Sequence, residues 1–315
     1  MTGPEEHAET VRSGDYRVRE RKSDNSPNPY KETDVPKRIS TARGREFGAG
    51  VRAAIAGAGL TSRAVADIVD WDEAKVSDVV NGKGGATLLE VATLLGACRV
   101  GAAEIAHLLS LYPQAEMKGW WQPHGTCAPV RLRTLAENLA VAKSLTSWHT
   151  HMVPLFLQTV EYMREALLAS STVPEAELQE RVAAQLAMQE LLRGGKKCAF
   201  FIHELALHLR VGGAEVHTGQ LLHLLIMAKW ANVTIRIVPA AHGAHPGLAG
   251  PFTQLTFAKY EPLVWVDTEN SSLLAEATDA IAGYDKVIRA LYETSLDEVE
   301  SAKLIVRLYD ALHPA

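Results

Sequence analysis

The chain has 315 residues, of which 47% are hydrophobic and 22% are charged, and its formal net charge is −5. This length predicts two domains plus a tail with enough apolar side chains for buried cores, and the charge excludes a strongly basic nucleic-acid binder. No apolar run is long enough to cross a membrane and none resembles a secretory signal, so we expect a cytoplasmic protein.

Residues 1–44 are rich in Ser, Pro, Asn and charged residues and contain few large apolar side chains. Such a segment cannot bury enough surface to order itself, so we predict a disordered N-terminal tail. Two basic clusters lie in or next to it: Arg17, Arg19, Arg21 and Lys22, and then Lys37, Arg38, Arg43 and Arg45. Two interpretations stay open, an arm that touches phosphates or the minor groove of DNA and an ordinary solvated tail.

Residues 45–111 have a helical pattern of apolar residues, and we expect an all-α bundle. A first amphipathic helix places Phe47 on its apolar face and ends at the turn Gly57-Ala58-Gly59. Later in the segment, Thr87 is a typical N-cap residue for a further helix, and a short helix over residues 102–109 closes the unit.

Between these helices, residues 60–82 predict two short helices joined by a tight turn. Thr61 and Asp72 can each cap a helix N-terminus with a side-chain oxygen, and Asn81-Gly82 is a typical helix end. The apolar face of the first helix is expected to contain Ala64, Val65, Ile68 and Val69. In a helix-turn-helix the second helix enters the major groove of DNA, so this stretch indicates DNA as a partner.

The order of these elements resembles the phage-repressor (XRE) class of helix-turn-helix domains. The matching residues are Gly59-Leu60-Thr61, Val65-Ala66, Lys75-Val76-Ser77 and Asn81-Gly82. The resemblance implies that the second helix reads base edges with its exposed start and that the first helix lies near phosphates. It assigns DNA contacts to Thr61, Ser62, Arg63, Glu73, Ala74, Lys75 and Ser77. Ser62 and Asp78 depart from the class, which usually has a glutamine and an arginine there.

The charge of the bundle argues against tight DNA binding. Residues 46–110 contain five Arg and Lys residues against eight Asp and Glu residues. DNA affinity depends largely on cations that displace condensed counterions, and Asp78 would repel phosphate. Two interpretations stay open. The bundle is a DNA-binding domain assisted by a dimer or by the basic arm, or it is a protein-interaction module that has lost DNA contact.

Residues 112–131 contain three prolines, two adjacent tryptophans and little periodicity. We interpret this segment as a linker whose aromatic pair, Trp120 and Trp121, packs on the following domain. Contact of the pair with a ligand is the alternative.

Residues 132–315 mix helical and strand patterns and predict an α+β domain, a small sheet covered by helices. Strands are expected at residues 145–148, 198–202, 233–238, 252–257 and 263–266. Helices are expected at residues 132–143, 158–169, 174–193, 218–230, 273–291 and 296–312.

This half resembles the C-terminal domain of unknown function found in actinobacterial antitoxin-like transcriptional regulators, where it follows an XRE-class bundle. The runs that carry the resemblance are Gly119-Trp120-Trp121 and residues 153–159, 232–239 and 243–252. Phe156 departs from the pattern, which has a glycine there, and smaller departures are Pro246 and Asp267. The resemblance implies a one-component regulator, often encoded beside a small partner protein that binds it.

An enzyme or metal protein is a third reading of the C-terminal half. His149 and His151 are two residues apart and would share a face of a strand, and the other candidate ligands are His203, His208, His242 and His245. The sequence shows no carboxylate or cysteine spacing to complete such a site. Cys98, Cys127 and Cys198 are scattered, and we expect Cys98 and Cys198 to be buried thiols.

A glycine-rich run at residues 243–250 follows a strand but lacks the Gly-Lys-Ser/Thr ending of a phosphate loop. We therefore interpret it as a flexible loop with several positive-φ turns. No serine elbow or paired carboxylates occur, so the sequence predicts no enzyme, no cofactor and no metal.

The sequence thus predicts a DNA-binding transcriptional regulator whose C-terminal domain mediates dimerisation or senses a partner or ligand. The expected partners are double-stranded DNA, a second copy of the chain in a homodimer and a small protein encoded nearby. An antitoxin-like interaction module with little DNA binding is the alternative.

Overall fold

A computed structural model describes residues 40–112, 120–123, 128–268 and 271–312. The predicted disordered tail lies outside the described residues except for its last five positions, and so does Cys127. The first helix already begins at Ala42, three residues before the expected start of the bundle at residue 45. Within the described part of the chain, no helix is both long enough and apolar enough to span a membrane.

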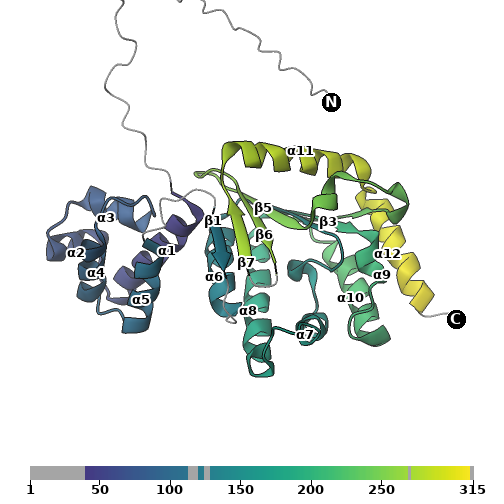
Figure 1. The fold of residues 1–315 in the computed structure, drawn as a ribbon, viewed down its shortest axis with the longest axis horizontal. Coiled ribbons are helices and arrows are strands. Elements are labelled where there is room, and N and C mark those ends of the chain that lie inside the picture. Colours follow the sequence, from purple (N-terminus) through teal and green to yellow (C-terminus); the bar gives the residue numbers. More distant parts are fainter. Residues whose placement is uncertain (1–39, 113–119, 124–127, 269–270, 313–315) are drawn as a thin grey trace, which may run out of the picture. The chain divides into compact units, whose positions relative to one another are not determined.

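The N-terminal region forms an all-α bundle of five helices (Figure 1). They are α1 (Ala42–Gly57), α2 (Ser62–Val69), α3 (Glu73–Val80), α4 (Leu88–Ala97) and α5 (Ala102–Leu111). Its core is built from apolar side chains at helical spacing, so the periodic pattern of the sequence is confirmed as a buried face. The fully buried members include Phe47, Val51, Val65, Val76, Val79, Val91, Leu94 and Leu108.

The predicted caps form as expected. The Thr61 hydroxyl accepts the Ala64 N–H at 3.1 Å, and an Asp72 carboxylate oxygen accepts the Lys75 N–H at 2.6 Å. The Thr87 hydroxyl accepts a backbone N–H of α4 in the same way. Each cap satisfies a backbone donor that the first turn of a helix leaves free, and together they set where three helices begin.

The C-terminal region is an α+β domain built on one seven-stranded sheet of order β1-β7-β6-β5-β2-β3-β4. The strands are β1 (Trp120–Pro123), β2 (Ser144–His149), β3 (Lys197–His203), β4 (Val233–Val238), β5 (Phe252–Thr256), β6 (Leu263–Asp267) and β7 (Ser271–Ala275). β2, β3 and β4 are parallel, and the remaining pairs are antiparallel.

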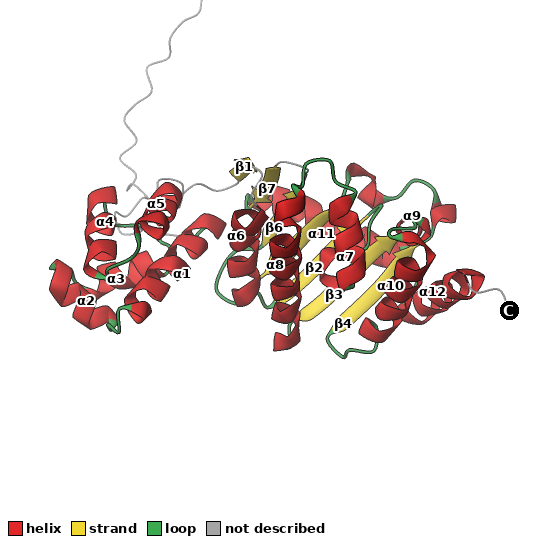
Figure 2. Cartoon of the chain, turned by 90° about the horizontal axis from the view of Figure 1, so that it is seen from below, coloured by secondary structure: helices red, strands yellow, loops and turns green. Residues whose placement is uncertain are grey.

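Helices cover both faces of this sheet, as the fold class predicts. Figure 2 shows α6 (Ala128–Val141), α7 (Val160–Leu168), α8 (Leu178–Glu190) and α10 (Gly213–Met227) over one face. The opposite face packs on α11 (Thr278–Thr294), with Trp148, Phe201 and Ile281 in the core between them.

The outer edge of β4 is closed by the last part of the chain. The backbone N–H of Leu296 donates to the Ile237 carbonyl, and the Ser301 hydroxyl accepts the Ile237 N–H at 2.9 Å. Ser301 lies in α12 (Glu298–Leu312), which also packs on α10. These contacts occupy hydrogen-bonding groups of an edge strand that would otherwise be free to pair with another chain.

Three elements differ from the expectations. Residues 271–275 form β7 although the sequence pattern assigned residue 273 onwards to a helix, because Leu273 and Leu274 continue the apolar spacing of α11. The segment predicted as a linker contains β1, which pairs with β7. The short helix α9 (Glu204–His208) was not expected, since five residues are too few to show helical periodicity.

Candidate nucleic-acid interface

Helices α2 and α3 are each eight residues long and are joined by the turn Asp70-Trp71-Asp72. Asp70 adopts a left-handed conformation with φ 54°, and the Trp71 N–H donates to the Ala66 carbonyl at 2.9 Å. Asp and Asn tolerate this backbone conformation better than other side chains. The two-helix geometry expected for residues 60–82 is therefore present.

Six of the seven candidate DNA-contacting residues have exposed side chains. They are Thr61, Ser62, Arg63, Glu73, Ala74 and Ser77. Arg63 Nε lies 3.6 Å from a carboxylate oxygen of Glu73, so the starts of α2 and α3 lie side by side on one surface. Of these candidate residues, Arg63 and Glu73 are in contact across the two helices, and the assignment of DNA contacts to the set stays a prediction.

Lys75, the seventh candidate, is held within the protein. Its ammonium lies 2.5 Å from Glu90 Oε1 and 4.6 Å from the centroid of the Trp71 ring, and only 25% of its side chain is exposed. The hydrogen bond from Lys75, together with one from the Thr87 backbone, lowers the pKa of Glu90 to about 2. Glu90 was not singled out in the sequence, although Thr87 and Glu90 have the spacing of a capping box.

Two further cations, Arg52 of α1 and Lys83 just after α3, also have partners. Arg52 Nη2 donates to the Val80 carbonyl at 2.7 Å, and Lys83 Nζ lies 3.6 Å from Asp78. The Asp78 charge, which was expected to repel phosphate, is thereby partly offset. Exposed pairs of this kind are weak and exchange readily, so Arg63, whose side chain is 80% exposed, is the cation most available to a ligand.

A hollow of about 380 Å³ lies beside the turn between α2 and α3. It is lined by Val69, Asp70, Trp71, Asp72, Lys75, Glu90 and Thr93. Three large apolar side chains of the bundle are exposed: Ile68 at 56% on α2, and Leu88 at 48% and Leu89 at 76% on α4. The expectation that Ile68 faces the core is wrong, because the eight residues of α2 bury only Val65 and Ala66.

The runs that carried the C-terminal resemblance have structural roles here. Gln220 accepts the Thr159 N–H and donates to the Leu157 carbonyl, which satisfies an irregular backbone segment inside the helical layer. Gln158 donates to the Val153 carbonyl in the same segment. Phe156, which stands where the pattern has a glycine, is buried and packs on Phe200.

The glycine-rich run folds over the end of β2. Trp148 Nε1 donates to the Gly247 carbonyl at 2.8 Å, and a side chain on Gly247 would overlap the Trp148 ring. Gly243 and Gly250 have positive φ, as predicted for this loop. The loop is held against the sheet at Gly247.

His203 and His245 lie together beside Trp148, with ring centroids 5.1 Å apart. Each Nδ1 accepts a backbone N–H, from Leu205 and Gly247 respectively. The proton of each neutral ring is therefore assigned to Nε2. No group of three or more potential metal ligands occurs among the residues described.

The cysteines Cys98 and Cys198 are both buried, as expected. Burial raises the pKa of the Cys198 thiol to about 11 and also raises that of Cys98. Both thiols are therefore protonated near neutral pH and lack the reactivity of a thiolate.

Comparisons with known proteins give one result. A family model described as Domain of unknown function (DUF5753) matches residues 132–307, which is more than half of the chain. No curated protein and no solved structure matches the chain. The matched region covers α6 to α12 apart from their outermost ends and does not include the bundle.

Proposed function

The chain belongs to the DUF5753 family, and on this premise we propose that it is a DNA-binding transcriptional regulator of the cytoplasm, active as a homodimer. Its C-terminal domain then serves dimerisation or senses a partner or ligand. The observation that supports the proposal is the surface formed by the starts of α2 and α3, where six exposed candidate residues lie on adjacent helices.

We expect the start of α2 to contact DNA phosphates and α3 to contact the bases. Ser62 and Arg63, at the start of α2, are suited to phosphate, because hydroxyl and guanidinium groups donate to its oxygens. Ser77 and Lys75 of α3 are suited to base edges in the major groove. Glu73 and Ala74, in the first turn of α3, would lie closest to the bases and set which of them are accepted.

The bundle supplies few free cations for this task. Lys75 has to leave Glu90 before it can contact DNA, and Arg63 has to leave Glu73. Each exchange replaces one ion pair with another and reduces the net gain. We therefore expect weak binding by a single bundle, with the affinity of a dimer coming from two half-sites on one duplex.

The test is a titration of the purified protein with DNA from upstream of its own gene at several salt concentrations. Binding should weaken steeply as salt rises, and Lys75→Glu should abolish it. Lys303→Glu is the matched control, since it makes the same charge change at an exposed position of α12. If the Lys75→Glu protein binds DNA with unaltered affinity, α3 does not contact the DNA.

A second function, an antitoxin-like interaction module with little DNA binding, is favoured by a separate observation. Lys75 and Arg63 are both paired with acidic side chains, and the apolar side chains of Ile68 and Leu89 are exposed. Co-expression with the products of neighbouring genes tests this function. An Ile68→Ser, Leu89→Ser double variant should lose the partner while its salt-dependent DNA binding, if any, persists.

A further inference from the structure

The first turn of α1 belongs to the bundle in sequence, yet the C-terminal domain holds it. Glu276, just after β7, accepts the Ala42 N–H at 2.9 Å and pairs with Arg45 Nη2 at 3.3 Å. Asn138 of α6 accepts from Arg45 Nε at 2.6 Å and donates to the Ala42 carbonyl. The Arg45 guanidinium also lies 4.6 Å from the centroid of the Phe257 ring.

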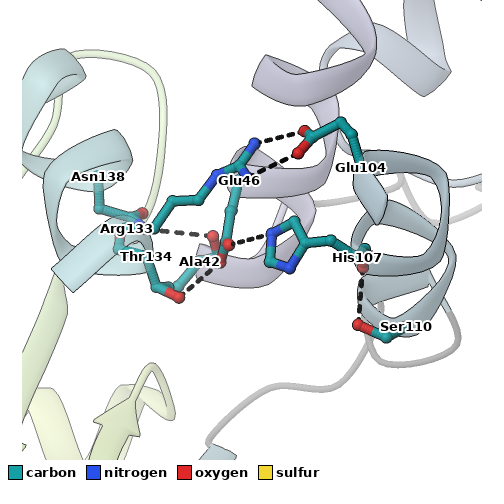
Figure 3. A network of polar contacts seen from close by, with 8 residues as sticks. All are labelled: Ala42, Glu46, Glu104, His107, Ser110, Arg133, Thr134 and Asn138. Atoms are coloured by element: carbon teal, nitrogen blue, oxygen red, sulfur yellow. Dashed lines mark hydrogen bonds and ion pairs between the residues drawn. The ribbon is translucent and has the colours of Figure 1, made fainter. Parts of the chain in front are cut away.

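The next residue, Glu46, ties the same turn to two further helices (Figure 3). Its carboxylate is 1% exposed and lies 3.1 Å from His107 Nε2 of α5. The other oxygen accepts from the Thr134 hydroxyl of α6 at 2.5 Å. A buried carboxylate needs such partners, so Glu46 links α1 to both α5 and α6.

An outer ion pair closes this contact region. Arg133 of α6 donates to both carboxylate oxygens of Glu104 on α5, at 2.7 and 3.0 Å (Figure 3). Two parallel hydrogen bonds restrict orientation more than a single pair does. The set Arg45, Glu46, Thr134, Asn138 and Glu276 is called the α1 joint below.

Further along, the backbone of α1 contacts the backbone at the end of α3. A Cβ atom on Gly48 would lie 2.6 Å from the Val80 carbonyl oxygen, and one on Gly82 would overlap the Gly44 carbonyl. Arg52 of α1 donates to the same Val80 carbonyl. Because no side chains separate the two backbones, a displacement of α1 moves the end of α3 with it.

We propose that the α1 joint positions α3, so that Glu276 and Asn138 of the C-terminal domain control the placement of the DNA-contacting residues through α1. The inference rests on the proposed function and names its regulation. A ligand or partner that shifts β7 or α6 would move the first turn of α1 through the α1 joint. The contact between Gly48 of α1 and Val80 would then pass this movement on to α3. Buried charge pairs cannot lengthen gradually at low cost, so the joint is either made or broken.

Amide hydrogen exchange of the full chain, without DNA, tests the joint. Glu276→Gln keeps an oxygen acceptor for the Ala42 N–H and removes the charge opposite Arg45. Exchange of the amides at residues 76–82 should then rise at least about tenfold more than exchange of the amides of β3. Glu300→Gln, which removes one partner of an exposed pair on α12, is the control and should change neither region.

Two outcomes would overturn the proposal. One is faster exchange confined to the first turn of α1, which would mean that α3 does not follow the joint. The other is an equal rise in both domains, which would mean a general loss of stability. Thr134→Val provides a second variant, because it removes only the hydroxyl that donates to Glu46 and keeps the side-chain shape.

Coupling between two sites is reciprocal, so a change at the contact between α1 and α3 should also affect the α1 joint. Gly48→Ala pushes α1 away from Val80, and it should speed exchange in α6 around Asn138. Unchanged exchange there would contradict the joint. A protein that shows both exchange effects but binds no DNA would overturn the proposed function alone, so the two failures are distinguishable.

Discussion

The ammonium of Lys75 lies 2.5 Å from one carboxylate oxygen of Glu90, whose second oxygen accepts the Thr87 N–H at 2.6 Å. One acidic side chain therefore stabilises the start of α4 and at the same time binds the candidate DNA-contacting cation of α3. The ion pair joins residues 15 positions apart and keeps Lys75 beside the hollow at Trp71. DNA phosphate has to compete with Glu90 for this lysine.

Glu90→Gln is expected to increase DNA affinity. The glutamine oxygen still caps Thr87, while the charge that holds Lys75 is lost. One freed cation and one fewer acid near phosphate should raise affinity by about three- to tenfold at low salt, with a steeper salt dependence. Fluorescence anisotropy at several salt concentrations measures both quantities.

Asp67→Asn is the matched control for that variant, because it makes the same charge change at an exposed position of α2. A purely general effect of net charge would raise affinity equally in both proteins. That result would show that the Lys75–Glu90 pair does not restrain binding.

Gly247→Ala should destabilise the C-terminal domain. A methyl group there overlaps the Trp148 ring, which is fully buried, so the loop or the ring has to move at a cost of about 1 to 3 kcal/mol. Gly283→Ala, on the exposed side of α11 with open space around it, should instead be neutral or stabilising. Urea unfolding of the three proteins compares them directly, and equal stability of the Gly247→Ala protein would show that the loop is not packed on Trp148.

Acid should weaken the same loop through His203 and His245. Burial lowers the pKa of both imidazoles, with a further lowering at His245 from His203 and His242 and an opposing effect of Glu204 on His203. The folded state therefore binds fewer protons than the unfolded state, in which histidine titrates near about 6.5. The free energy of unfolding should be steady above that pH and fall as the pH drops below it toward the lowered values.

Unfolding midpoints of the wild type and His245→Gln, measured between about pH 8 and about pH 5, check this expectation. The variant lacks one titrating ring and should lose less stability on acidification. An identical pH profile would place the acid-sensitive group elsewhere, and His149 is the first candidate because its desolvation lowers its pKa to about 4.

Breaking the buried pair between Arg45 and Glu276 should be costly. Glu276→Ala leaves a guanidinium in a site where burial already lowers its pKa, and the expected loss is about 3 to 5 kcal/mol of unfolding free energy. Arg45→Met combined with Glu276→Leu should recover part of this loss, since two apolar side chains leave no charge unpaired. Chemical unfolding of the single and double variants measures the difference, and a double variant no more stable than Glu276→Ala would show that the unpaired charge is not the cause.

Interactions between neighbours in the chain were predictable. Thr61, Asp72 and Thr87 each cap a helix through an atom within three residues, and the β-branched run of β4 was recognised by its alternation. β7 was missed because Leu273 and Leu274 continue the apolar spacing of α11, and α9 was missed because five residues show too little helical periodicity.

The sequence by itself determined the helical bundle, the α+β class of the second half and the surface on which Ser62, Arg63 and Ser77 lie, because these depend on local spacing and capping. Only the tertiary structure decided that Lys75 is paired with Glu90 and that Glu276 holds Arg45 across 231 positions. Such contacts depend on how helices and strands pack. That packing brings distant residues together and removes them from water. The interaction energy of each charged group therefore depends on neighbours that the local sequence pattern does not contain.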